Sequence, residues 1–78
     1  MNEIDVVITC LKDDAEYVER IAACYLAIMK FDGCFTYKTN DYVFSNNTKL
    51  TFTLKGFNLD YLYDIGLKLK NFCDSIYL

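Results

Sequence analysis

Four cysteines are the side chains of this sequence best suited to hold a metal ion. They are Cys10, Cys24, Cys34 and Cys73, and four thiolates are the number that a structural zinc ion takes. No two of them form the close pair with which zinc motifs usually begin. A free cysteine inside a protein behaves as a small apolar side chain. We therefore expect structural thiols and no bound metal or cofactor, and a zinc-stabilised protein that uses the cysteines or the acidic residues is the alternative.

Carboxylates gather near the start of the chain, at Asp13, Asp14, Glu16 and Glu19. Two neighbouring carboxylates can perform acid–base catalysis, and three can hold a hard cation. Acidic residues also stabilise the first turn of a helix, where the helix dipole attracts negative charge. No spacing among these four defines a metal or catalytic motif, so we expect them to lie on the surface.

Catalysis has little support elsewhere in the sequence. There is no histidine, which is the usual general base near neutral pH. The glycines Gly33, Gly56 and Gly66 lie too far apart to form a phosphate-binding loop. We therefore predict that the protein is not an enzyme.

The elements that must position these residues alternate between strand and helix patterns. A D-x-x-E capping pattern at Asp13 and Glu16 starts the first helix, Asp32-Gly33 ends it, and Asn58 is the expected N-cap of the second. We predict an α+β single domain over residues 1–78, with two layers, in which a four-stranded, mostly antiparallel sheet carries two helices on one face. The predicted order is β-α-β-β-β-α, with strands over 4–11, 34–38, 42–45 and 48–55 and the second helix over 59–77.

The first helix is apolar on every side in its second half, because residues 21–29 read IAACYLAIM. Ile21, Cys24 and Ile28 are expected to face the core. The core should also contain Leu50, Phe52 and Leu54 of the last strand and Leu62, Leu69 and Cys73 of the second helix.

The remaining side of the first helix is the predicted contact surface. It carries Ala23, Leu26 and Ala27, rimmed by the acids at the helix start, Asp13, Asp14, Glu16 and Glu19. Small apolar residues let a second helix approach closely, and the acids favour a basic partner. The partner is then a protein with a basic surface or a second copy of the chain in a homodimeric structural domain.

Charge and hydropathy restrict the remaining partners. The formal net charge is −3, which disfavours direct binding to a nucleic-acid backbone, although Phe35, Tyr37, Lys38 and Tyr42 together are typical of a base-stacking surface. The nine-residue apolar run is shorter than the ~20 residues that span a bilayer. The N-terminus lacks the basic stretch and cleavage site of a signal peptide, so we expect a cytoplasmic protein without membrane contact.

The short acidic chain, rich in Asn, Lys and Tyr, resembles phage-encoded counter-defence proteins of the anti-CRISPR type. The resemblance covers the whole chain in size, charge and composition, and no motif carries it. It implies a stoichiometric inhibitor that occupies a nucleic-acid-handling protein. The acidic cluster at Asp13, Asp14, Glu16 and Glu19 is then the candidate for competing with DNA or RNA.

Overall fold

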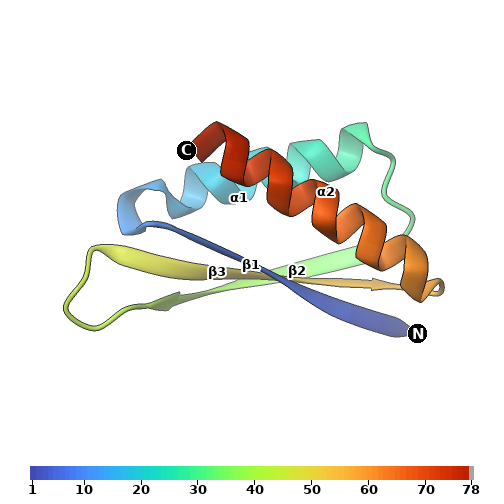
Figure 1. Cartoon of the computed structure of the whole chain (residues 1–78), viewed down its shortest axis with the longest axis horizontal. Helices are drawn as coiled ribbons and strands as arrows, with labels where there is room; N and C mark the ends of the chain where they lie inside the picture. The colour runs from blue at the N-terminus through green and yellow to red at the C-terminus, as the bar shows by residue number, and fades with distance from the viewer. Residues whose placement is uncertain (78) are drawn as a thin grey trace.

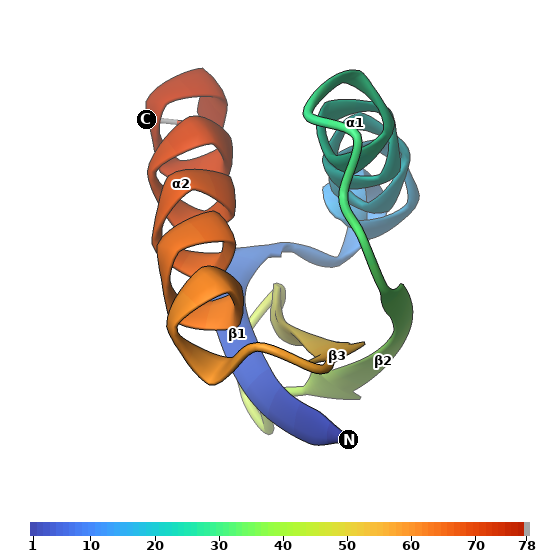
Figure 2. The same cartoon turned by 90° about the vertical axis from the view of Figure 1, so that its right-hand side faces the viewer.

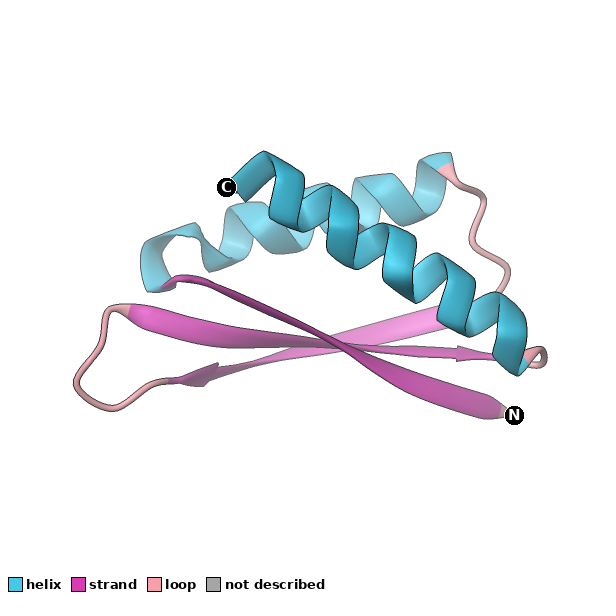
Figure 3. Cartoon of the chain, in the orientation of Figure 1, coloured by secondary structure: helices cyan, strands magenta, loops and turns pink. Residues whose placement is uncertain are grey.

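The computed structural model describes the backbone of residues 1–77 and the side chains of residues 1–76. Strands and helices follow one another in the order β-α-β-β-α (Figure 1, Figure 3). The predicted α+β class is therefore confirmed. The bounds are β1 Asn2–Leu11, a short 3-10 turn η1 Lys12–Asp14, α1 Ala15–Ile28, β2 Cys34–Asp41, β3 Asn47–Gly56 and α2 Leu59–Tyr77.

The central strand is β3, which pairs with β1 on one side and with β2 on the other. Both pairings are antiparallel, and Phe52 of β3 lies opposite Val6 and Tyr37. Along β3 the even-numbered apolar residues Leu50, Phe52 and Leu54 are buried. The odd-numbered residues of β3 are threonines and lysines with one asparagine, and they lie on the opposite face of the sheet.

The predicted fourth strand over 42–45 is wrong, since the sheet has three strands within the described residues. β2 continues to Asp41, through the expected turn, and the chain reverses over residues 42–46. Phe44 has φ 66°, a left-handed conformation that no strand residue adopts. The N–H of Tyr42 donates to the carbonyl of Asn47 at 3.1 Å and closes the loop.

Both helices lie on the same face of the sheet, as predicted, with α2 over β1 and α1 beside it (Figure 2). The core fills the space between the two layers. Among residues 1–77 no helix is long and apolar enough to cross a membrane. The buried apolar side chains are Val6, Ile8, Cys10, Val18, Ala22, Leu26, Leu50, Phe52, Leu54, Leu62, Ile65, Leu69 and Cys73.

The predicted inward face of α1 is wrong. Cys24 is exposed and Ile28 is 78% exposed, whereas Val18, Ala22 and Leu26 are buried. The spacing of apolar residues fits both faces, so it cannot select one of them. The buried set includes the small Ala22, which is 0% exposed at the centre of the helix.

The end of α1 helps to fix this orientation. The N–H of Phe31 donates to the carbonyl of Leu26 at 2.9 Å, and the N–H of Lys30 donates to Ala27 at 3.1 Å. These two bonds form a Schellman motif, in which apolar residues at the positions of Leu26 and Phe31 usually pack together. Lys30, with φ 54°, occupies the left-handed position that ends α1, so the helix ends before Asp32-Gly33, where its end was predicted. Gly33 instead lets its backbone lie close to the backbone of β3, because a Cβ at this position would overlap the carbonyl oxygen of Lys55.

The starts of the two helices differ. The predicted capping box at Asp13 and Glu16 is not formed, because η1 precedes α1 and the N-cap of α1, Asp14, makes no side-chain capping bond. The predicted cap of α2 is confirmed, since the Oδ1 of Asn58 accepts the N–H of Tyr61 at 3.0 Å.

Candidate functional site

The loop between β2 and β3 presents three large side chains to solvent at one end of the molecule. Tyr42, Val43 and Phe44 are all exposed, and Phe44 extends fully into solvent. The loop is nevertheless ordered by hydrogen bonds, since the N–H of Asn47 donates to the Oγ of Ser45 at 3.1 Å in addition to the bond that closes the loop. The monomer therefore holds an apolar loop in place without burying it.

Phe44 also has an unfavourable backbone conformation. A bulky residue at φ 66° lies where glycine or asparagine is normally found. The left-handed conformation costs about 1–2 kcal/mol for a residue with a Cβ. Nothing that Phe44 contacts inside the monomer offsets this cost, because its side chain is fully exposed. Strain of this kind at a surface residue suggests a function.

The start of the helical layer lies beside this loop. The N–H of Lys12 in η1 donates to the carbonyl of Asn46 at 2.7 Å, and Leu11, Lys12, Asp13 and Asn46 line a shallow hollow between them. Both segments lie at the left end of the molecule in Figure 1. We call Leu11, Tyr42, Val43 and Phe44 the tip surface. Its rim carries two exposed acids, Asp13 and Asp41, and one exposed base, Lys12.

The acidic residues singled out in the sequence lie near this end. Asp13 in η1 is exposed, and Asp14 at the start of α1 is half-buried. Glu16 is exposed and accepts a hydrogen bond of 2.7 Å from Arg20, one turn along the helix. Glu19 follows on the same side of α1 and is half-buried. Asp13 therefore borders the tip surface, and the role of the four acids as the rim of a contact surface stays a prediction.

The apolar part of the predicted contact surface is divided. Leu26 is 2% exposed and belongs to the core, so it cannot meet a partner from the surface. Ala23 is half-buried and Ala27 is exposed; with Phe35 they border a hollow between α1 and β2. The reason is the rotation of α1, which turns Leu26 inward and leaves the alanines facing β2.

The three apolar residues of α1 that were expected to point inward form a second surface together with Tyr17 instead. Tyr17, Cys24 and Ile28 are exposed, and Ile21 between them is half-buried. Their spacing of three and four residues places them along one side of the helix. Next to this side, Tyr25 stacks on Phe72 of α2 with ring centroids 4.4 Å apart, so the two helices are already packed together beneath it.

The cysteines do not converge. Cys10 lies opposite Thr48 and Cys34 opposite Lys55, at opposite ends of β3. Burial raises the pKa of the Cys10 thiol, with Asp14 adding to the effect, and burial with the nearby Asp74 raises the pKa of Cys73 to about 11. Cys24 and Cys34 are exposed. Within residues 1–77 no three acidic or thiol side chains gather as a metal site would require.

Val43 and Phe44 were missed as functional residues because their sequence fits a short strand, and Tyr42 was singled out only for a base-stacking surface. The one available signal was Asn46-Asn47 directly after them, which favours a turn. Comparison with protein families, with curated proteins and with solved structures finds no match to this chain. The function is therefore argued from the geometry of the molecule.

Proposed function

We propose that this chain is a non-enzymatic binding protein that inserts its tip surface into an apolar pocket of a basic protein partner. The observation that carries the proposal is Phe44, a fully exposed aromatic residue held at φ 66° by an ordered loop. Aromatic residues that enter a pocket supply most of the binding energy of many interfaces, and polar residues surround them. Tyr42 and Phe44 fit the first role, and the charged rim fits the second.

The charge of the chain supports a basic partner. The formal net charge is −3, and the rim next to the tip surface carries Asp13 and Asp41. Basic surfaces of this kind occur on proteins that handle DNA or RNA. We propose that the chain occupies such a surface as a stoichiometric inhibitor in the cytoplasm, in the manner of the anti-CRISPR proteins that it resembles. The protein would then contact neither nucleic acid nor membrane directly.

The alternative of a zinc-stabilised protein gains no observation in its favour, because Cys10 and Cys34 lie at opposite ends of the sheet and the other two cysteines lie on different helices. A homodimeric structural domain remains a proposal that light scattering tests. The binding proposal rests on the loop at Phe44. It predicts that a substitution which relieves the strain at Phe44 stabilises the protein and weakens partner binding.

Phe44→Gly is the test. Glycine adopts φ 66° without steric cost, so the variant is expected to be about 1 kcal/mol more stable in urea denaturation. The affinity of the variant for the partner should also fall at least roughly 30-fold, as expected for an interfacial hot spot. The partner is captured from host extract with the wild-type protein, and affinities for the purified partner are measured by interferometry.

Ile28→Gly is unsuitable as a control because it weakens the helix, so Ile28→Ala serves instead. It removes another exposed apolar side chain from a different surface, and the variant should bind the partner as the wild type does. If Phe44→Gly retained full affinity, or if the captured partner lacked a basic surface, the proposal would be wrong.

A further inference from the structure

The outer edge of β1 has no strand beside it. Within residues 1–77, β1 pairs with β3 on one side only. The carbonyl of Val7 accepts a hydrogen bond of 3.2 Å from the Nζ of Lys70, so the backbone of Val7 points away from β3. Because backbone groups alternate along a strand, Asp5 and Thr9 present theirs to the same side. Such a row of donors and acceptors is a template for another strand.

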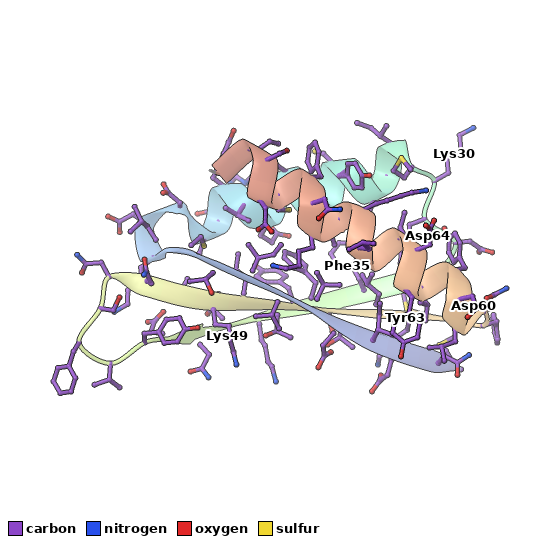
Figure 4. All side chains as sticks on the ribbon, in the orientation of Figure 1. Lys30, Phe35, Lys49, Asp60, Tyr63 and Asp64 are labelled. Carbon is purple, nitrogen blue, oxygen red and sulfur yellow. The ribbon has the colours of Figure 1, made fainter. Side chains whose placement is uncertain are left out.

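The helix α2 overhangs this edge. A Cβ on Gly66 would lie 2.7 Å from Ile4 and 3.2 Å from Val6, so α2 sits directly above β1. Farther out on α2, Tyr63 is 59% exposed and Leu67 is 62% exposed. These two side chains and the edge of β1 enclose a cleft of about 390 Å³. Figure 2 shows α2 above β1 at the border of the sheet, and Figure 4 shows Tyr63 extending from α2 toward β1.

The widths of the two layers explain the overhang. Two packed helices with axes about 8–10 Å apart cover roughly 20 Å. Three strands about 4.8 Å apart cover only about 14 Å. The helical layer is therefore wide enough to cover one more strand. Tyr37 of β2, on the helix side of the opposite edge, is exposed, so the vacant place under the helices lies along β1.

A second copy of the chain does not fit this place. Pairing β1 with the β1 of another copy would set the two α2 helices about one strand spacing, or ~4.8 Å, apart. Helices need about 8–10 Å between their axes. A single extended segment with no helix above it fits.

The charges along β1 define the chemistry of that segment. Glu3 and Asp5 face the open side of the sheet, with the Glu3 side chain 62% exposed and its ion pair to Lys55 long, at 3.8 Å. A strand beside β1 places its own residues next to these acids, where Lys or Arg is favoured. On the helix side it meets Ile4, Val6 and Leu67, where apolar residues are favoured.

We propose that the β1 edge binds one extended segment of a partner protein, with alternating apolar and basic residues, by strand addition under α2. The incoming N–H takes the place of Lys70 at the Val7 carbonyl. Lys70 then keeps its existing ion pair with Asp74, whose Oδ2 lies 3.4 Å from its Nζ. This inference does not depend on the tip surface, because the cleft lies on the part of β1 from Ile4 to Val7.

The probe is a capped heptapeptide that alternates lysine and valine, with a fluorescent label for anisotropy. A matched peptide that alternates glutamate and valine should bind at least tenfold more weakly. Leu67→Glu should weaken binding of the lysine peptide at least tenfold. Ile28→Glu, which places the same charge on an exposed position of α1, should leave it unchanged. Lys70→Ala should tighten binding, because it removes the competing donor.

Amide exchange identifies the location, since Asp5 and Val7 should gain protection when the lysine peptide is bound. Equal affinity for the two peptides, or unchanged binding by Leu67→Glu, would overturn the proposal. So would a dimer in light scattering that Leu67→Glu dissociates, because a second copy would then occupy the edge. Phe44→Gly should bind the peptide normally, which separates failure here from failure of the proposed function.

Discussion

The orientation of α1 is best tested by removing two aliphatic side chains that lie two residues apart. Leu26 is 2% exposed and Ile28 is 78% exposed. Truncating a buried leucine to alanine removes its apolar contacts and leaves a cavity, which costs about 2–5 kcal/mol. Truncating an exposed isoleucine removes few contacts, and alanine is the better helix former by a few tenths of a kcal/mol, so Ile28→Ala should be neutral or slightly stabilising.

The assay is urea denaturation followed by circular dichroism. With a slope of about 1 kcal/mol per molar urea for a small domain, Leu26→Ala should lower the midpoint by roughly 2 M or more. Ile28→Ala should leave it within a few tenths of a molar. If Leu26→Ala is unfolded in buffer, the ranking still holds, because Ile28→Ala must remain folded. A larger loss for Ile28→Ala would refute the orientation and restore the face predicted from the sequence.

Other predictions follow from single buried or strained groups. The buried Oγ1 of Thr48 has no hydrogen-bond partner, so Thr48→Val should raise the free energy of unfolding by about 1 kcal/mol in the same assay. Lys30 at φ 54° is strained, and Lys30→Gly should stabilise the protein by up to about 1 kcal/mol; a loss would mean that the lysine side chain matters more than its backbone. Burial raises the pKa of the Cys73 thiol to about 11 from 9.0, so the folded state keeps this proton to higher pH than the unfolded state does. Stability should therefore fall between about pH 9 and 11, by at most roughly 1.4 kcal/mol per pH unit, and Cys73→Ala should reduce the slope.

The segments predicted well are those in which polar residues restrict the choice of face. In β3, Lys49, Thr51 and Lys55 alternate with apolar residues, so only one side of the strand can face the helices. In α2, Asp64 and Lys68 lie on the polar side and form the expected ion pair of 3.0 Å. A wrong orientation of either element would bury charge, which explains why the pattern was sufficient.

The segments predicted poorly lack that restriction. No charged residue lies between Arg20 and Lys30, so the second half of α1 can turn without burying charge, and its apolar spacing fits two faces equally. The structure selects the face with Ala22 at its centre, a choice that depends on the space available between α1, α2 and the sheet. The prediction for residues 42–46 was wrong for another reason. Tyr42, Val43 and Phe44 have high strand propensity, and only the backbone shows that Phe44 leaves the strand region.

The placement of the remaining apolar residues is informative about function. The chain is 54% hydrophobic, and three strands under two helices cannot enclose that much apolar surface. Random placement of the excess would leave scattered exposed residues, which are common on soluble proteins. Apart from the exposed side of α1 at Tyr17, Cys24 and Ile28, two groups lie at structurally special places, the strained loop at Phe44 and the overhang at Leu67 above an unpaired strand edge. Each lies next to acidic residues, Asp13 and Asp41 in the first case and Glu3 and Asp5 in the second. An apolar centre with an acidic border at both places is the arrangement expected if one basic partner meets the molecule at its tip and along β1.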